Sequence, residues 1–229
     1  MKPRNGIAAN CRRLLAVSAL ALTLTPVLGE TARAELPSQE LVKALQSGGY
    51  VVYKRHTKTE KNQEDLDHTN LANCATQRNL SEEGREQARV IAKAFKKLGI
   101  RTQSVLTSPY CRAKETATIA FGGAQIDNVL RYLSHIPDAE RPAAVERIVG
   151  LLGTEPQSGS NLMLVSHTEN LKQTTGIWPK NSGVMHVFKP LGNGAYQHMG
   201  KIDPGEWTQL ARLDGAAEGD KTCIWVFCW

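Results

Sequence analysis

Long apolar segments are scarce in this chain of 229 residues, so few of its segments are candidates for crossing a membrane. The one extended apolar stretch, residues 14–29, is broken by polar residues and a proline and is short for a bilayer span. No later segment is apolar over a sufficient length. We therefore expect no stable membrane anchor.

Internal repeats and low-complexity segments are also absent from the sequence. A chain of 229 residues can form one sizeable α/β domain with its own core, but not two large domains. Its hydrophobic content of 41% is ordinary for a globular protein. We expect a single domain over residues 35–229.

Excess charge is small once the amino-terminal segment is set aside. Residues 1–34 contain five basic residues and one acidic residue, so they account for +4 of the total net charge of +6 and leave +2 for the rest. A balance this small gives no reason to expect nucleic acid as a partner.

The first 34 residues have the pattern of a cleaved secretory signal. A basic start precedes the apolar stretch, and the small residues of Ala32-Arg33-Ala34 lie just before Glu35. Arg12-Arg13 also fits a twin-arginine export signal, although paired arginines are common in basic signal starts. We expect cleavage after Ala34 and a mature protein that is periplasmic or secreted.

Strands and helices alternate in the predicted secondary structure. Apolar runs predict buried strands at residues 49–56, 104–107 and 161–167, with a further strand or extended connection at 126–131. Apolar periodicity and capping signals predict helices at residues 38–48, 81–99, 109–122 and 138–152. Residues 185–190 and 196–202 flank a glycine-rich turn and predict a hairpin, followed by a helix-compatible segment at 206–210. This order predicts the α/β class: a three-layer α/β/α sandwich with a mostly parallel central sheet and helices on both faces.

Cationic residues end two of the predicted strands. Arg55 and His56 end the first, and His167 ends the run at 161–167. Arg112 falls in the first turns of the helix that we expect to begin at Pro109. Ligands of open α/β sheets bind at the carboxyl ends of the strands, and helix N-termini favour anions, so we predict that these side chains form one pocket.

Paired carboxylates are missing near these residues, which argues against a zinc site, as does the repulsion between guanidinium groups and a dication. Arginines instead bind phosphoryl oxygens through two-point contacts, and a neutral histidine can attack phosphorus. The polar, nonperiodic segment 57–79 is interpreted as a long loop rising from the first strand, of the kind that often carries function.

Three segments that carry these residues resemble the signature blocks of the histidine phosphatase superfamily, which has the phosphoglycerate mutase-like fold. The blocks are Tyr53-Lys54-Arg55-His56, Ser108-Pro109-Tyr110-Cys111-Arg112-Ala113-Lys114-Glu115-Thr116-Ala117 and Val165-Ser166-His167. Residues 74–81 and 176–179 are similar to a bacterial subgroup of exported small histidine phosphatases. The resemblance extends over about residues 49–210, and three blocks in order are more specific than any one alone.

The resemblance implies a phosphoric monoester hydrolase of the histidine acid phosphatase type, acting on a small phosphate ester. His56 would attack the phosphoryl group and carry it as phosphohistidine, while Arg55, Arg112 and His167 neutralise its oxygens. The resemblance implies no metal and no organic cofactor. Nothing in the sequence predicts the oligomeric state.

The sequence departs from the family pattern at two points. Thr57 stands where the family usually has glycine after the histidine, so we expect the backbone to approach the phosphate less closely. Many members carry an acidic proton donor after the second block. By position Asp138 is the first candidate here, with Glu140 and Glu169 behind it, but Asp138 is equally well read as a helix cap.

The remaining histidines, His68, His135, His186 and His198, are interpreted as ordinary polar residues, because a lone histidine specifies little. His68 is the first exception, since it lies in the long loop over the predicted pocket.

Two other functions compete with a phosphatase. One is a noncatalytic phosphate- or phosphosugar-binding protein, which the missing donor favours. The other is a phosphoglycerate mutase, against which the secretory signal argues. The subgroup also includes envelope enzymes that remove phosphate from lipopolysaccharide core heptose, so an envelope phosphosugar is one candidate substrate.

Four cysteines remain after signal cleavage, in a compartment where disulfides persist, and they allow three pairings. Cys74 lies towards the end of the long loop and Cys111 at the start of the next helix, so we predict a bridge between them. That bridge leaves Cys223 to pair with Cys228. The alternative is free buried thiols.

Overall fold

The computed structural model describes residues 34–219, with side chains described to residue 213. The predicted signal segment and the predicted Cys223–Cys228 bridge lie outside this range, so both stay predictions. Within the described range, no helix combines the length and the apolar character needed to cross a membrane.

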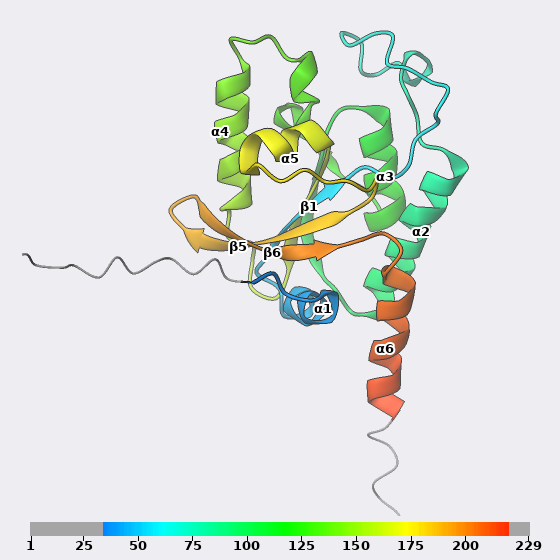
Figure 1. The fold of residues 1–229 in the computed structure, drawn as a ribbon, viewed down its shortest axis with the longest axis vertical. Helices are drawn as coiled ribbons and strands as arrows, with labels where there is room; N and C mark the ends of the chain where they lie inside the picture. Colours follow the sequence, from blue (N-terminus) through cyan, green and yellow to red (C-terminus); the bar gives the residue numbers. More distant parts are fainter. Residues whose placement is uncertain (1–33, 220–229) are drawn as a thin grey trace, which may run out of the picture. The chain divides into compact units, whose positions relative to one another are not determined.

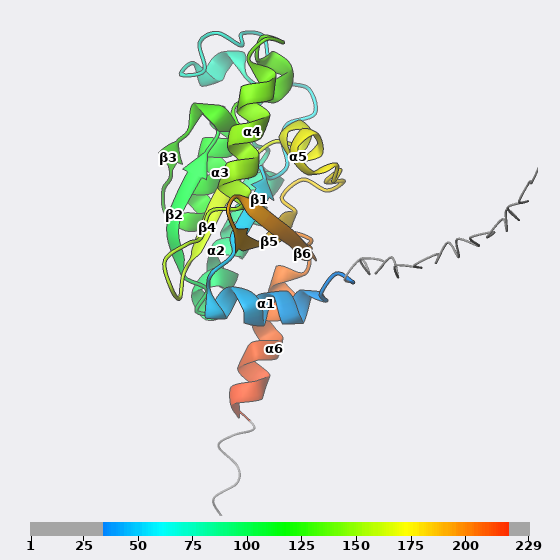
Figure 2. The same cartoon turned by 90° about the vertical axis from the view of Figure 1, so that its left-hand side faces the viewer.

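A six-stranded sheet forms the centre of the domain. Its strands are β1 (Val51–Arg55), β2 (Thr102–Thr107), β3 (Gln125–Ile126), β4 (Asn161–Ser166), β5 (Met185–Gly192) and β6 (Ala195–Ile202). Their spatial order is β3-β2-β4-β1-β5-β6, which can be followed in Figure 2 from β3 to β6. The first four strands pair in parallel, whereas β5 and β6 form an antiparallel hairpin beside β1. The mostly parallel sheet and the hairpin are both confirmed.

Helices cover both faces of this sheet. They are α1 (Ser38–Ser47), α2 (Glu82–Lys97), α3 (Cys111–Phe121), α4 (Arg141–Leu152), α5 (Thr168–Thr175) and α6 (Trp207–Gly219). Side chains alternate across a strand, so Val52 packs with apolar residues of α1, α2 and α6, whereas Val51 and Tyr53 pack with those of α4 and α5. Figure 1 shows α4 and α5 on one side of the β5–β6 hairpin and α1 on the other. The three-layer architecture is therefore confirmed.

Some element boundaries differ from the prediction. Helix α3 begins at Cys111 rather than Pro109, because the Ser108 hydroxyl accepts the backbone N–H of Tyr110 and keeps this turn outside the helix. Helix α4 likewise begins at Arg141 rather than Asp138. Residues 126–131 are largely a 3₁₀ turn at Asn128–Leu130, and Leu133–His135 is another. Helix α5 was not predicted; of its residues only Asn170 and Leu171 are buried, so it has no apolar stripe.

The long loop of residues 57–80 is anchored at its two ends. Thr59 and Leu80 form an antiparallel bridge, and the backbone N–H of Ser81 donates to the Lys58 carbonyl. The predicted cap is present, because Ser81 Oγ accepts the N–H of Gly84 at the start of α2. Gly84 packs directly on the Lys58 backbone, where a Cβ would collide, so glycine is required at this contact.

A disulfide fixes the middle of the loop to α3. Cys74, in the 3₁₀ turn Cys74–Thr76, is bonded to Cys111, as predicted. Beside this bond, the side-chain oxygen of Gln77 accepts the backbone N–H of Cys111 at 3.0 Å. The loop is thus fastened to the helix that carries Arg112, next to the carboxyl end of β1.

Candidate active site

The two strand-end histidines lie side by side. Strands β1 and β4 are parallel neighbours in which Arg55 pairs with Ser166, so the next residues, His56 and His167, leave the sheet together. The backbone N–H of His56 donates to the Ser166 carbonyl at 3.0 Å. The two imidazole rings are 5.5 Å apart between centroids, in an edge-to-face arrangement. Parallel register therefore brings together residues that are distant in the sequence.

His56 is held in one tautomer. Its side chain is buried, with 3% of the residue exposed, and Nδ1 lies 2.8 Å from the Thr57 carbonyl oxygen. A carbonyl only accepts, so Nδ1 carries the proton and the neutral ring keeps its lone pair on Nε2. Burial, and then the charge of Arg112, lower the pKa of His56 well below its usual value. His56 is therefore a neutral imidazole with a nucleophilic Nε2.

Thr57 does not offer its backbone N–H to this site. That N–H donates to Thr116 Oγ1 of α3 at 3.1 Å, and the Thr57 hydroxyl lies 3.1 Å from the same oxygen. The residue is fully buried. The departure from glycine thus adds a side-chain contact to α3 beside the backbone hydrogen bond.

Arg112 reaches the histidines from α3 and is 1% exposed. Its Nη1 lies 2.8 Å from Asp65 Oδ1 on the long loop, and its guanidinium stands 4.5 Å above the centroid of the Tyr110 ring. Burial lowers the pKa of Arg112, and the Asp65 charge opposes that shift. At Asp65 burial favours a higher pKa, but Arg112 and the backbone N–H of Arg78 together outweigh it, so the pKa lies below its usual value and the group is ionised.

His167 is oriented by two hydroxyl groups. Its Nε2 lies 2.8 Å from Ser108 Oγ, and its backbone carbonyl accepts the Tyr53 hydroxyl at 2.7 Å. The Ser108 oxygen accepts the N–H of Tyr110, and its hydroxyl proton can go to Nε2, which leaves the ring proton on Nδ1. Burial and then Arg112 lower the pKa of His167 well below its usual value, so this ring is neutral too.

Arg55 is fixed by the chain that precedes β5. Its Nη1 donates to the backbone carbonyls of Pro179 at 3.4 Å and Lys180 at 3.2 Å. Next to it on β1, the fully buried Lys54 donates to the Gly183 carbonyl at 2.8 Å. Segment 179–183 therefore sets the position of the Arg55 guanidinium.

Three buried donors of these residues have no hydrogen-bond partner among the described residues. They are Nε of Arg55, Nε of Arg112 and Nδ1 of His167. A buried polar atom without a partner costs roughly 1 to 3 kcal/mol, and an oxygen of a bound ligand would remove that cost. Two are guanidinium N–H groups, and the Ser108 contact makes the third an N–H as well. Donors of this kind fit the oxygens of a phosphoryl group.

Several residues near the site were not assigned a role from the sequence. Asp65 holds Arg112, and the charge of Arg78 acts on both Arg55 and His56. A cavity of about 270 Å³ opens beside Asp65 and is lined by Gln63, Glu64, Asp65, His68, Arg78, Tyr132 and His135. The polarity of the long loop was the one sequence signal for Asp65 and Arg78, and it did not single out either. His135 had been interpreted as an ordinary polar residue.

The three candidate proton donors lie elsewhere. Asp138 is a surface residue whose side chain is 90% exposed and forms an ion pair of 2.8 Å with Arg141. Glu140 is the exposed N-cap residue of α4, and the Glu169 carboxylate accepts the side-chain amide of Gln173. Among the described residues, none of the three forms an ion pair or hydrogen bond with the histidines or arginines of the site.

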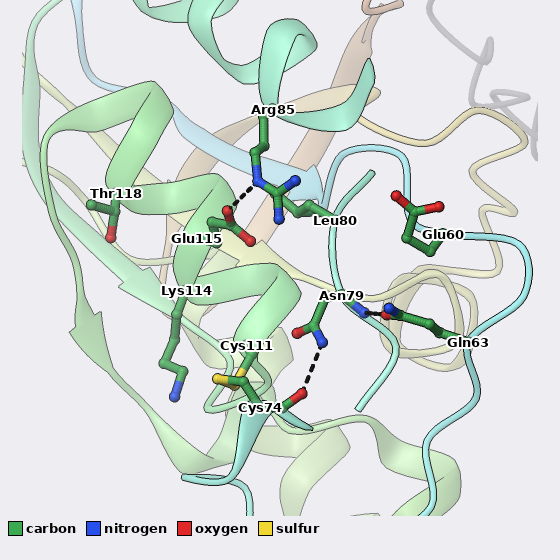
Figure 3. A pocket seen from close by; sticks show the side chains of 10 residues that line it. All are labelled: Glu60, Gln63, Cys74, Asn79, Leu80, Arg85, Cys111, Lys114, Glu115 and Thr118. Atoms are coloured by element: carbon green, nitrogen blue, oxygen red, sulfur yellow. Dashed lines mark hydrogen bonds and ion pairs between the residues drawn. A yellow bond between two sulfur atoms is a disulfide. The ribbon is translucent and has the colours of Figure 1, made fainter. Parts of the chain in front are cut away.

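A second cavity, of about 630 Å³, has both cysteines of the disulfide in its lining (Figure 3). It is lined by Glu60, Gln63, Cys74, Asn79, Leu80, Arg85, Cys111, Lys114, Glu115 and Thr118. Arg85 pairs with Glu115 across it at 2.7 Å. Its charged groups are of both signs. Neither this cavity nor the one beside Asp65 is lined by any of the four residues predicted to bind phosphate, but Asp65 itself contacts Arg112. Within residues 34–219, no three His, Cys, Asp or Glu side chains cluster as metal ligands would.

Comparison with solved structures shows which known fold this architecture resembles. The protein histidine phosphatase SixA in complex with tungstate is 16% identical, with a TM-score of 0.50 over 69% of this chain and 98% of that chain. A mycobacterial glucosyl-3-phosphoglycerate phosphatase is 17% identical, with a TM-score of 0.49 over 66% and 96%. A putative α-ribazole-5′-phosphate phosphatase from Escherichia coli is 17% identical, with a TM-score of 0.49 over 69% and 98%. The first likeness shows the fold: this is a phosphoglycerate mutase-like α/β protein.

The family comparison points to the chemistry. The model of the histidine phosphatase superfamily (branch 1) matches residues 51–131, a span that contains Arg55, His56 and Arg112. No curated protein sequence matches the chain. The family match supports the histidine phosphatase superfamily and, with it, phosphatase activity.

Proposed function

We propose that this protein is an exported phosphomonoesterase that works through a phosphohistidine formed on His56. The observation that carries the proposal is the state of the His56 ring. Its Nδ1 is engaged by the Thr57 carbonyl, so Nε2 keeps a lone pair, while burial keeps the ring neutral. The unpartnered donors of Arg55, Arg112 and His167 supply what the phosphoryl oxygens need.

The charge balance of the site is positive. Arg55, Arg78 and Arg112 contribute three positive charges, against two negative charges from Asp65 and the exposed Glu64, which lines the same cavity as Arg78. His56 and His167 add none, because burial lowers the pKa of each. The remaining positive charge favours an anionic ligand such as a phosphate monoester.

The reaction then has two displacements at phosphorus. Nε2 of His56 attacks in line, the bond between phosphorus and the leaving oxygen breaks, and the arginines stabilise the charge on the equatorial oxygens. Water attacks the phosphohistidine in the second step, and the electron pair of the N–P bond returns to Nε2. Each step uses residues of this chain alone.

Export and substrate class rest on separate observations. The signal pattern of residues 1–34 supports a mature protein, residues 35–229, that is periplasmic or secreted. The cavity of about 270 Å³ beside Asp65 supports a small phosphate ester, and an envelope phosphosugar is one candidate.

One observation favours the competing function of a noncatalytic phosphate-binding protein. None of the three candidate carboxyl donors lies in the site, and a protein without a leaving-group acid could bind phosphate esters without turning them over. The two functions differ in one measurable quantity, the amount of covalent phosphohistidine.

The test is a rapid-quench experiment with mature protein and p-nitrophenyl phosphate. We expect a burst of p-nitrophenolate stoichiometric with the enzyme and acid-labile phosphate on the peptide that contains His56. His56→Ala should abolish both, whereas His198→Gln, a ring that pairs with His186 instead, should retain both. If the wild-type protein binds vanadate but forms no phosphohistidine, it is a binding protein.

A further inference from the structure

Titratable aromatic side chains gather on the outer side of Arg112. The imidazoles of His68 and His135 are stacked, with centroids 3.6 Å apart and planes inclined by 28°. Tyr132 packs edge-on against His135, with centroids 4.7 Å apart, and its ring also lies 5.3 Å from that of His167. His68, His135 and Tyr132 all line the cavity beside Asp65. The proposed mechanism above uses none of these three side chains.

Tyr110 connects His135 to the phosphate-binding residues. Its hydroxyl lies 2.6 Å from Nδ1 of His135, and its ring lies 5.2 Å from that of His167 and beneath the Arg112 guanidinium. His135 is therefore one tyrosine away from both groups that would hold the phosphoryl oxygens. The cavity that His135 lines is also lined by Asp65, the ion-pair partner of Arg112, and so lies next to that arginine.

We propose that His135 is the acid that protonates the leaving-group oxygen as the P–O bond breaks. This role rests on the proposed phosphatase function and supplies the donor that the carboxyl candidates do not provide. Asp65 is the carboxylate nearest to the phosphate-binding arginine, but it is ionised, since Arg112 and the backbone N–H of Arg78 both bind the same oxygen. His68 acts through His135 as a positioning residue, because its ring stacks on the donor.

The hydrogen bond to Tyr110 identifies the nitrogen that transfers the proton. Burial raises the pKa of Tyr110 to about 12, so its hydroxyl stays protonated and donates to Nδ1 of neutral His135. In the acid form both ring nitrogens carry protons and the tyrosine oxygen accepts from Nδ1. Nε2 is then the nitrogen free to serve the substrate.

The proton balance closes over the two steps. In the first, Nε2–H of His135 gives its proton to the leaving oxygen, which also takes the electron pair of the P–O bond, and an alcohol departs. His135 is then neutral, with a lone pair on Nε2. In the second step this lone pair takes a proton from the water that attacks the phosphohistidine, which restores the acid form.

The surroundings of His135 predict an acidic optimum. His68, Asp65, Arg112, Arg131, Tyr110 and Tyr132 are the titratable groups around it. Burial, and then the positive charges among these groups, lower the pKa of His135 below its usual value, while Asp65 opposes the shift. The acid form is present below that pKa, so turnover that needs the proton should fall as pH rises through it.

The decisive experiment compares two leaving groups, both measured by single turnover on the full mature protein. p-Nitrophenolate leaves without a proton, whereas the alkoxide of glycerol phosphate requires one. We expect His135→Gln to lower the rate of phosphohistidine formation about 10²- to 10⁴-fold with glycerol phosphate but less than tenfold with p-nitrophenyl phosphate. With glycerol phosphate, the fall of this rate at high pH should be present in the wild-type protein and absent from His135→Gln.

The control variant is Asp138→Asn, whose side chain lies at the surface, and it should leave both rates unchanged. Equal losses with the two substrates in His135→Gln would show a structural role and overturn the proposal, as would a selective loss in Asp138→Asn. Failure of the wild-type protein to form phosphohistidine from either substrate would instead refute the proposed function.

Discussion

Asp65 Oδ1 lies 2.8 Å from Nη1 of Arg112 and also accepts the backbone N–H of Arg78 at 3.0 Å. One carboxylate oxygen of the long loop thus binds the buried arginine of α3 and the backbone of a second arginine. The disulfide between Cys74 and Cys111 joins the same two elements. The position of Arg112 therefore depends on the loop as well as on its own helix.

We expect Asp65→Asn to bind anions more tightly than the wild-type protein. The substitution keeps the shape of the side chain and removes the negative charge that faces Arg112, so inhibition constants for vanadate and inorganic phosphate should fall about 3- to 10-fold. The rate constant for turnover should fall, because phosphate leaves more slowly. Asp67→Asn is the control, since Asp67 is bonded to Thr69 and Asn70 of its own turn. Unchanged inhibition constants would show that the Asp65 charge does not act on the bound anion.

Arg112→Lys should weaken both binding and turnover. An ammonium group cannot reproduce the planar contact of a guanidinium with a phosphoryl group, and it lacks the Nε donor that is buried without a partner. We expect kcat/KM for p-nitrophenyl phosphate to fall roughly 10²- to 10³-fold, with a parallel loss of vanadate inhibition. Arg141→Lys, which alters the surface pair with Asp138, is the matched control. An Arg112→Lys variant with normal inhibition would place Arg112 outside the phosphate site.

Lys54 should make the stability of the fold rise with pH. Burial lowers its pKa from 10.5 to about 7, so between these values the unfolded chain binds a proton that the folded chain does not. The free energy of unfolding contributed by Lys54 therefore increases with pH from about 7 to about 10, with a slope approaching 1.4 kcal/mol per pH unit.

Lys54→Met should flatten this slope, which urea unfolding at pH 7.5, 8.5 and 9.5 can measure. The lost bond to the Gly183 carbonyl adds a constant offset and leaves the slope readable. Lys43→Met, at an exposed site on α1, is the control. If the wild-type protein and Lys54→Met have parallel pH dependences, Lys54 is not titrating in the folded protein.

Local patterns predicted which strand ends lie side by side. The sequence shows apolar runs that end in basic residues or histidine. The parallel register of β1 and β4 then brings Arg55, His56 and His167 to one edge of the sheet. The α/β sandwich followed from the alternation of strands and helices, and the Cys74–Cys111 bridge followed from where the two cysteines lie.

The residues that surround these side chains could not be predicted in the same way. Asp65 and His135 come from irregular segments, and their contacts with Arg112 and Tyr110 depend on tertiary packing that no periodicity encodes. Sequence position favours a carboxyl donor at Asp138, three residues from His135, but that aspartate pairs with Arg141 at the surface. The start of α3 was misplaced because the Ser108 hydroxyl binds an N–H two residues on instead of capping a helix.

The disulfide offers the last test, because it links stability to the site. Cys74 and Cys111 are 37 residues apart, and a bridge over a loop of that length stabilises by about 4 kcal/mol if unstrained. The double variant Cys74→Ser, Cys111→Ser should therefore lose about this much in urea unfolding. It should also show a raised KM, since the loop would hold Arg112 less firmly in position, whereas Asp65→Asn preserves that contact through its side-chain oxygen. Cys223→Ser, Cys228→Ser serves as the control and should change KM little. Nonreducing peptide mapping of the mature protein checks the bridge itself. Free thiols at Cys74 and Cys111, or either one joined to Cys223 or Cys228, would contradict the pairing and, with it, the covalent link between the loop and helix α3.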